Sequence, residues 1–135
     1  MTKEDKELLI KDLCARLPYE VKVHAKYIDT ITDVEVEKVG VLSMVDNDTI
    51  IAFTCDDTNC YNYVTIHEVK PYLFPMSSMT EEQSKTYHEL VSGMFGTSTL
   101  INFEVLTDFF HKNHLDYRGL IPMGLAIDAT GLNIY

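Results

Sequence analysis

The sequence is poor in arginine and cysteine and has no long hydrophobic run. Arg16 and Arg118 are the only arginines, which leaves few side chains for the bidentate phosphate and guanine contacts of nucleic-acid readers. No apolar run approaches the roughly 20 residues that a membrane helix needs, and the charged N-terminus lacks a secretory-signal pattern. Cys14, Cys55 and Cys60 are an odd number of cysteines, which favours reduced thiols. We therefore expect a cytoplasmic protein without direct contact to nucleic acid or membrane.

Negative charge is concentrated in one part of the chain. The 135 residues carry a formal net charge of −10, and residues 19–70 hold ten acids against four lysines. An acidic face of this kind can meet a basic protein partner, and it can equally be a solvated surface that keeps the protein soluble. The length predicts a single domain spanning residues 1–135.

Hydrophobic periodicity predicts an α+β fold. Residues 1–18 have helical spacing, with a capping box expected between Thr2 and Asp5. Residues 19–70 alternate in short runs between acidic turns, which predicts a small antiparallel β-meander or an SH3-like barrel, with a bend or bulge at Gly40. Residues 71–135 are expected to form two helices and a packed, extended C-terminal tail.

The stretch VKPYLFPMSSMTEEQ marks the expected change from strand to helix. Val69 is expected to end the sheet, because Pro71 and Pro75 cannot donate to a ladder. The intervening residues 72–74 are then expected to leave the sheet and cover its open edge. Thr80 and Gln83 match a capping box that starts a helix ending near Gly93. A second helix over 103–112 is expected to bury Phe103, Leu106, Phe109 and Phe110.

The candidate binding residues are acids in turns and tyrosines near them. Turns project from a sheet, so their acids are the most free to face a partner. Tyr61 and Tyr63 alternate along a strand, which favours a place in the core over a role as a binding platform. The candidate set is Asp29, Asp33, Asp46, Asp48, Asp56, Asp57, Tyr61, Tyr63 and Tyr72.

Metal ligands are present, but their spacing is unfavourable. Cys55, Cys60 and His67 form the alternative zinc set, yet the two cysteines flank a predicted turn and not a zinc knuckle. His111 and His114 lie at a helix end, where imidazoles complement the helix dipole, with Asp116 nearby. We therefore expect no metal and no cofactor.

An enzymatic alternative rests on the same turn acids. Asp46, Asp48, Asp56 and Asp57 could meet at one end of the sheet and share a metal or a proton, as in a small hydrolase or a nucleotide-processing enzyme. The sequence contains no nucleophile elbow, phosphate loop or dinucleotide fingerprint, so no catalytic residue is assigned. Convergence of these acids and His67 around a pocket would favour the enzyme; a convex arrangement would favour binding.

The C-terminal half of the chain resembles a group of known proteins. VKPYLFPMSSMTEEQ together with DYRGLIPMGLAIDATGLNIY resembles small uncharacterised proteins encoded by phages and mobile elements of anaerobic gut bacteria. No activity is carried over from that group. The resemblance implies a phage-type accessory or host-interaction protein in a bacterial cytoplasm. We therefore expect a non-enzymatic protein that binds a protein partner, through an acidic face.

Overall fold

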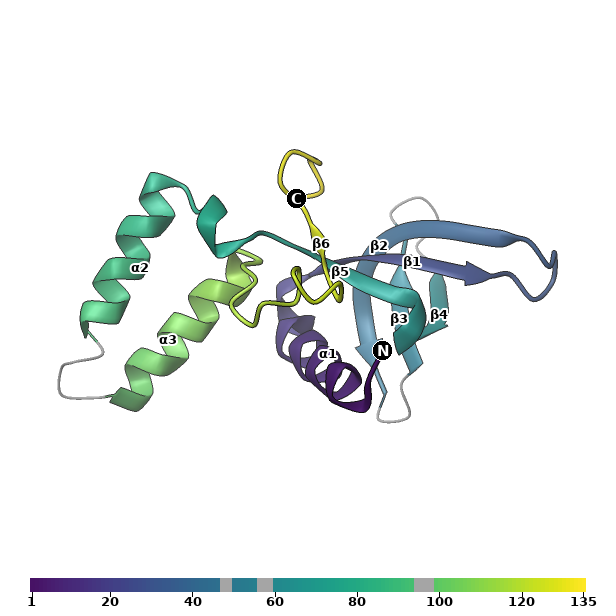
Figure 1. Ribbon diagram of the computed structural model, residues 1–135, viewed down its shortest axis with the longest axis horizontal. Coiled ribbons are helices and arrows are strands. Elements are labelled where there is room, and N and C mark those ends of the chain that lie inside the picture. The colour runs from purple at the N-terminus through teal and green to yellow at the C-terminus, as the bar shows by residue number, and fades with distance from the viewer. Residues whose placement is uncertain (47–49, 56–59, 94–98) are drawn as a thin grey trace.

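The computed structural model describes residues 1–46, 50–55, 60–93 and 99–135. It has an N-terminal helix, a six-stranded and mostly antiparallel sheet, and then two helices (Figure 1). The α+β prediction is confirmed, whereas the prediction that residues 1–135 form a single domain stays a prediction. Within the described residues, no helix combines the length and the hydrophobicity needed to cross a membrane.

The first helix begins where the sequence predicts. Helix α1 spans Lys3–Arg16, and Thr2 and Asp5 form the expected capping box: each side chain accepts a hydrogen bond from the backbone N–H of the other residue. Leu9 and Leu13, one turn apart, are fully buried against the sheet. Pro18 follows, and the chain continues as the short 3-10 helix η1 (Leu17–Tyr19). One apolar stripe on α1 therefore holds it against the sheet.

Four strands form the predicted meander, and two more extend it. The strands are β1 (Lys22–Ile28), β2 (Glu35–Val45), β3 (Ile50–Thr54), β4 (Tyr61–Thr65), β5 (Val69–Leu73) and β6 (Ile127–Asp128). Their order in the sheet is β4-β3-β2-β1-β5-β6, and only the β5–β6 pair is parallel. The 3-10 helix η2 (Ile66–Glu68) links β4 to β5. The chain thus returns from one edge of the meander to pair with β1 on its other side.

The expected strand boundary at Val69 is wrong. Val69 begins β5, which pairs antiparallel with β1, so that Val23 faces Pro71. Pro71, Tyr72 and Leu73 are buried in this strand, so they do not form a cover over an edge. Pro71 has no N–H and so removes one hydrogen bond from a short ladder. The carbonyl of the next residue, Tyr72, accepts a hydrogen bond from the Tyr135 hydroxyl.

Gly40 is required by a close approach of strands. A Cβ at this position would lie 2.4 Å from the carbonyl oxygen of Thr54 and 2.7 Å from the Phe53 ring. The bulge expected at Gly40 lies further along, because the β2–β3 register shifts between Leu42 and Met44. Gly40 therefore permits close packing of β2 against β3, and the bulge lies after Gly40 in the chain.

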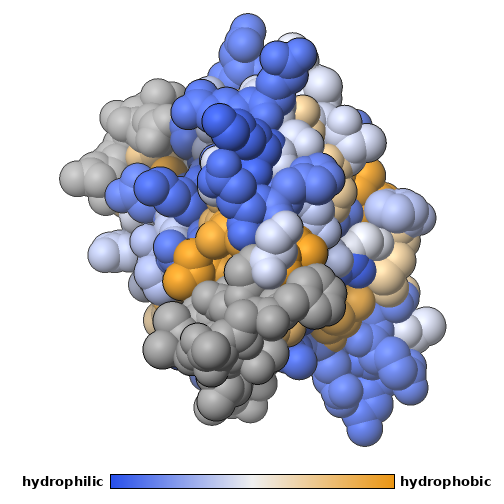
Figure 2. All heavy atoms as spheres, turned by 90° about the vertical axis from the view of Figure 1, so that its left-hand side faces the viewer, coloured by the Kyte–Doolittle hydropathy of each residue, from blue (hydrophilic) through white to orange (hydrophobic). Residues whose placement is uncertain are grey.

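The helical half has its own apolar cluster. Helices α2 (Glu81–Gly93) and α3 (Thr99–Lys112) pack against each other, and Thr80 and Gln83 form the predicted capping box. Leu106 and Phe110 are buried there, but Phe103 is 58% exposed, so its predicted burial is wrong. Figure 2 looks onto this end of the molecule, where a hydrophobic band lies between hydrophilic regions.

The first part of the tail packs as the sequence predicts, whereas Leu132 is 50% exposed. Leu125, Ala126 and Ala129 are buried, and β6 lies beside β5. The Tyr135 hydroxyl accepts a hydrogen bond from the Lys22 N–H (2.9 Å) and donates one to the Tyr72 carbonyl (2.8 Å). This hydroxyl therefore bridges β1 and β5 and fastens the tail to the sheet.

Candidate functional site

A two-stranded arm projects from the sheet. Strand β1 pairs with β5 only from Val23 to Ala25, and β2 pairs with β3 only from Val41 onward. Beyond these points β1 and β2 pair only with each other and extend past the other strands (Figure 1). We call residues 26–37 the arm. Its exposed apolar side chains are Ile28 (62%), Ile31 (93%) and Val34 (58%).

The turn at the tip of the arm is ordered by its own acids. The Asp29 carboxylate accepts hydrogen bonds from the backbone N–H groups of Ile31 (2.8 Å) and Thr32 (3.4 Å). Asp33 has a φ of 56° and donates its N–H to the Asp29 carbonyl (2.8 Å). Aspartate tolerates this left-handed conformation better than most residues. Both acids therefore also have a structural role in the turn.

The arm carries more negative than positive charge. One lysine stands against four acids, a net charge of −3. Lys26 contacts Glu35 (3.3 Å) and Glu37 (3.6 Å), and these acids, Glu35 first, raise the pKa of its ammonium group. The two acids that Lys26 does not contact, Asp29 and Asp33, lie at the tip beside the exposed Ile31.

The other predicted acids do not form a described cluster. Asp46 is exposed at the end of β2, and its N–H bonds the Ile50 carbonyl. Asp48, Asp56 and Asp57 lie outside the described residues. His67 is exposed on η2, in a shallow pocket with His24 and Lys70 that does not include Asp46.

The three predicted tyrosines lie in two different environments. Tyr61 and Tyr63 are 64% and 63% exposed on β4, so the prediction that they belong to the core is wrong. Side chains of β4 do alternate between the two faces of the sheet, but Val64 faces the core and the two tyrosines face outward. Tyr72 is only 6% exposed, and burial raises the pKa of its hydroxyl.

The alternative zinc ligands are not brought together. Cys55 directly follows β3 and Cys60 directly precedes β4, and His67 lies beyond the opposite end of β4, a strand about 16 Å long. Within the described ranges no three His, Cys, Asp or Glu side chains are grouped to hold a metal ion. The carboxylate of Asp116 accepts the backbone N–H groups of Leu120 and Ile121.

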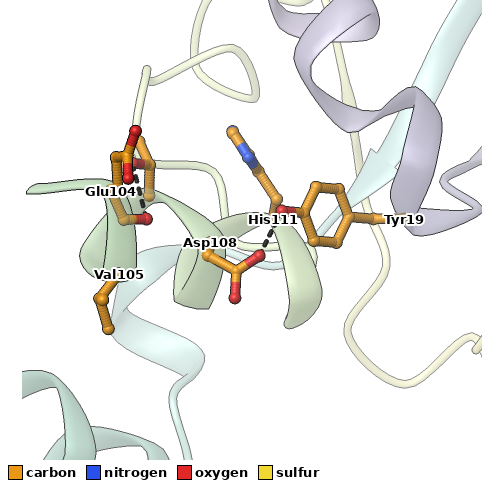
Figure 3. A pocket seen from close by; sticks show the side chains of 6 residues that line it. Tyr19, Glu104, Val105, Asp108 and His111 are labelled. Carbon is orange, nitrogen blue, oxygen red and sulfur yellow. Dashed lines mark hydrogen bonds between the residues drawn. The ribbon is translucent and has the colours of Figure 1, made fainter. Parts of the chain in front are cut away.

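A cleft that the sequence reasoning missed lies between η1 and α3. It has a volume of about 470 Å³ and is lined by Tyr19, Glu104, Val105, Thr107, Asp108 and His111 (Figure 3). The Tyr19 hydroxyl donates to the Asp108 carboxylate, and this bond raises the pKa of Tyr19. The helical spacing of Glu104, Asp108 and His111 is the signal that could have found the cleft.

Two polar groups of the cleft, Asp108 and His111, are paired within the protein. His111 Nε2 lies 2.8 Å from the Tyr117 hydroxyl, and burial, followed by the charge of Arg16, lowers the pKa of this imidazole. Behind Tyr117, Asp12 bonds both Arg16 (2.8 Å) and Arg118 (3.1 Å). Both guanidinium groups also lie against the Tyr117 ring. The network joins α1, α3 and the tail, so it explains this cleft as a structural junction.

Comparison with protein-family models, curated proteins and solved structures finds no match to this chain.

Proposed function

We propose that this chain is a non-enzymatic interaction protein that binds a protein partner through the arm. The observation that carries the proposal is Ile31, which is 93% exposed at the tip of a projecting hairpin, with Ile28 and Val34 also exposed close by. Exposed apolar side chains gathered on one projection are typical of contact surfaces. Folding alone gives no reason to place three of them there.

The order of the arm supports the same function. The Asp29 carboxylate and the β1–β2 ladder hold the tip in one conformation before any partner arrives. A preordered loop loses less conformational entropy on binding than a flexible one. The tip can therefore present Ile31 to a partner at low entropic cost.

Charge indicates the chemistry of the partner. Asp29 and Asp33 flank Ile31 and give the tip a negative rim around an apolar centre. A complementary partner offers an apolar pocket rimmed by lysine or arginine side chains. An anionic membrane surface would repel the same tip. The resemblance of the C-terminal half adds the setting of a phage-type accessory or host-interaction protein in a bacterial cytoplasm.

The test removes apolar area and charge separately. Tagged wild type, Ile31→Ser and a control, Leu132→Ser, are used to capture partners from bacterial cytoplasm, and mass spectrometry identifies them. Leu132 is also exposed but lies in the tail. We expect a partner that binds the wild type and the control but is lost with Ile31→Ser.

The charge test uses Asp29→Asn with Asp33→Asn, because asparagine keeps both an acceptor oxygen and tolerance of positive φ. Its matched control is Glu4→Gln with Glu81→Gln, two acids remote from the arm. At low salt we expect the arm variant alone to associate more slowly, and at high salt we expect the rates to converge. A partner that binds all variants equally would reject the arm as the contact surface.

A further inference from the structure

The sheet has two edges of different character. Edge strand β6 has two residues, which is short enough to offer little template for pairing. Edge strand β4 has five residues, and no described strand pairs with its outer side. Its sequence, YNYVT, contains no charge and no proline, and its register with β3 runs without a bulge. Proteins usually protect exposed edges with these devices, and β4 has none of them.

We propose that β4 pairs with β4 of a second copy of this chain, antiparallel and centred on Tyr63, to form a homodimer. This goes beyond the arm, which is formed by other strands. In this register Tyr63 faces its own equivalent, Tyr61 faces Thr65 of the second copy, and Asn62 faces Val64. Aromatic pairs and aromatic–β-branched pairs are favourable cross-strand neighbours. The strand is thus complementary to itself.

The surface around the edge extends this complementarity. Within one copy, Tyr63 faces Ala52 of β3, and Ala52 faces Met44 of β2. Tyr63 and Met44 are exposed on this face, at 63% and 40%. Tyr63, Ala52 and Met44 form one row across the strands of each copy. Pairing about Tyr63 joins the rows of the two copies into one apolar strip, which removes tyrosine surface from water.

Charge at the two ends of β4 sets the antiparallel direction. Lys38 Nζ donates to the Asn62 side chain (3.1 Å) near one end of the strand. At the other end Glu68 accepts hydrogen bonds from the N–H and the hydroxyl of Thr65 (both 2.9 Å). Antiparallel pairing puts the Asn62 end of one copy beside the Thr65 end of the other. Antiparallel pairing therefore keeps the two Lys38 ammonium groups apart and the two Glu68 carboxylates apart, whereas parallel pairing would place like charges side by side.

The oligomeric state tests the proposal. Sedimentation of the wild type with increasing concentration should show a monomer–dimer equilibrium. Tyr63→Lys, which faces its own equivalent, should raise the dissociation constant at least about tenfold through repulsion of like charges and loss of the aromatic pair. The control is Val39→Lys, which adds the same charge to an exposed position on central strand β2 and should leave the dimer intact. Circular dichroism checks that both variants are folded.

A crosslink tests the register. In a background with all three native cysteines changed to serine, Tyr63→Cys should form an interchain disulfide on oxidation, because the two residues face each other. Tyr61→Cys should not, because residue 61 faces residue 65. A wild type that remains monomeric, or equal crosslinking at both positions, would overturn the proposal. The arm variants should not change the mass, which separates this result from the partner-binding test.

Discussion

The Tyr135 ring lies on the imidazole of His114, with the ring centroids 3.7 Å apart and the planes 10° from parallel. His114 directly follows the last turn of α3 and has a φ of 54°, so it ends that helix in the left-handed conformation. Its Nδ1 is buried without a hydrogen-bond partner in the described part of the chain. The stack therefore connects the end of α3 to the tail through an imidazole that is poorly placed to carry charge.

The pH dependence of stability follows from this imidazole. Burial, followed by the charge of Arg16, lowers the pKa of His114 to about 4. In the unfolded chain the pKa is about 6.5, so between these values the unfolded state binds more protons. Stability should fall as the pH is lowered from about 6.5 to about 4, by roughly 2 kcal/mol from this group after a discount for solvent screening of the partly exposed imidazole. Chemical denaturation across this range measures the change.

His114→Asn is the control for that prediction, because asparagine tolerates positive φ but does not titrate. Other acids and His111 titrate in both proteins, so the difference between the two curves isolates His114. Parallel curves between pH 6.5 and pH 4 would contradict the assignment.

The Tyr135 hydroxyl can be removed without changing the ring. Tyr135→Phe leaves the Lys22 N–H and the Tyr72 carbonyl without their shared partner. We expect a loss of about 1–3 kcal/mol in the free energy of unfolding, measured by urea titration. Tyr61→Phe, at an exposed position, should change it by less than about 0.5 kcal/mol. Equal effects would mean that the bridge adds nothing.

The ion network behind Tyr117 gives a larger effect. Asp12 and Arg16 are both fully buried, and Asp12→Asn would leave two guanidinium groups without their carboxylate. Breaking a buried ion pair from one side costs about 3–5 kcal/mol. Glu35→Gln, in an exposed pair with Lys26, should cost less than about 1 kcal/mol. Thermal melts that do not separate these variants would show that the network is solvated.

Gly40→Ala tests the close approach of β2 and β3. The added methyl group would meet the Thr54 carbonyl, a backbone atom that moves only with its strand. We expect a loss of about 1–3 kcal/mol and weaker amide protection in β3, measured by hydrogen exchange. Ser43→Ala, three residues along the same strand, is the control. An unchanged exchange pattern would show that β3 shifts without cost.

Local signals explain which parts of the fold could be predicted. The capping boxes at Thr2 and Thr80 and the alternation in β1 use neighbours in the sequence, and the structure confirms them. The predicted end of the sheet at Val69 is wrong, because a proline does not by itself end a strand. Pro71 lies in β5 opposite Val23, and Tyr135, which is distant in sequence, bonds the backbone of the neighbouring residues Lys22 and Tyr72. No local pattern contains that information.

Some features of the candidate sites could also be predicted from the sequence, and others could not. The sequence indicated that turn acids project, but not that Asp29 would order the arm or that Ile31 would stand exposed beside it. Alternation along β4 shows that its side chains point to two faces, but it does not show which face meets the core. Helical spacing indicates only the α3 side of the cleft; the contact of Asp108 with Tyr19, 89 positions away in the sequence, forms only in the folded protein.

The position of β1 in the sheet has a consequence for synthesis. One side of β1 finds β2 immediately in its own hairpin, whereas the other side needs β5 and the tail, which leave the ribosome much later. Until then a nascent chain exposes an unpaired strand next to an apolar helix face, a combination that recruits other chains. Translation arrest before β5 should therefore yield aggregates or chaperone-bound fragments, and full-length chains should close this edge in the last step of folding.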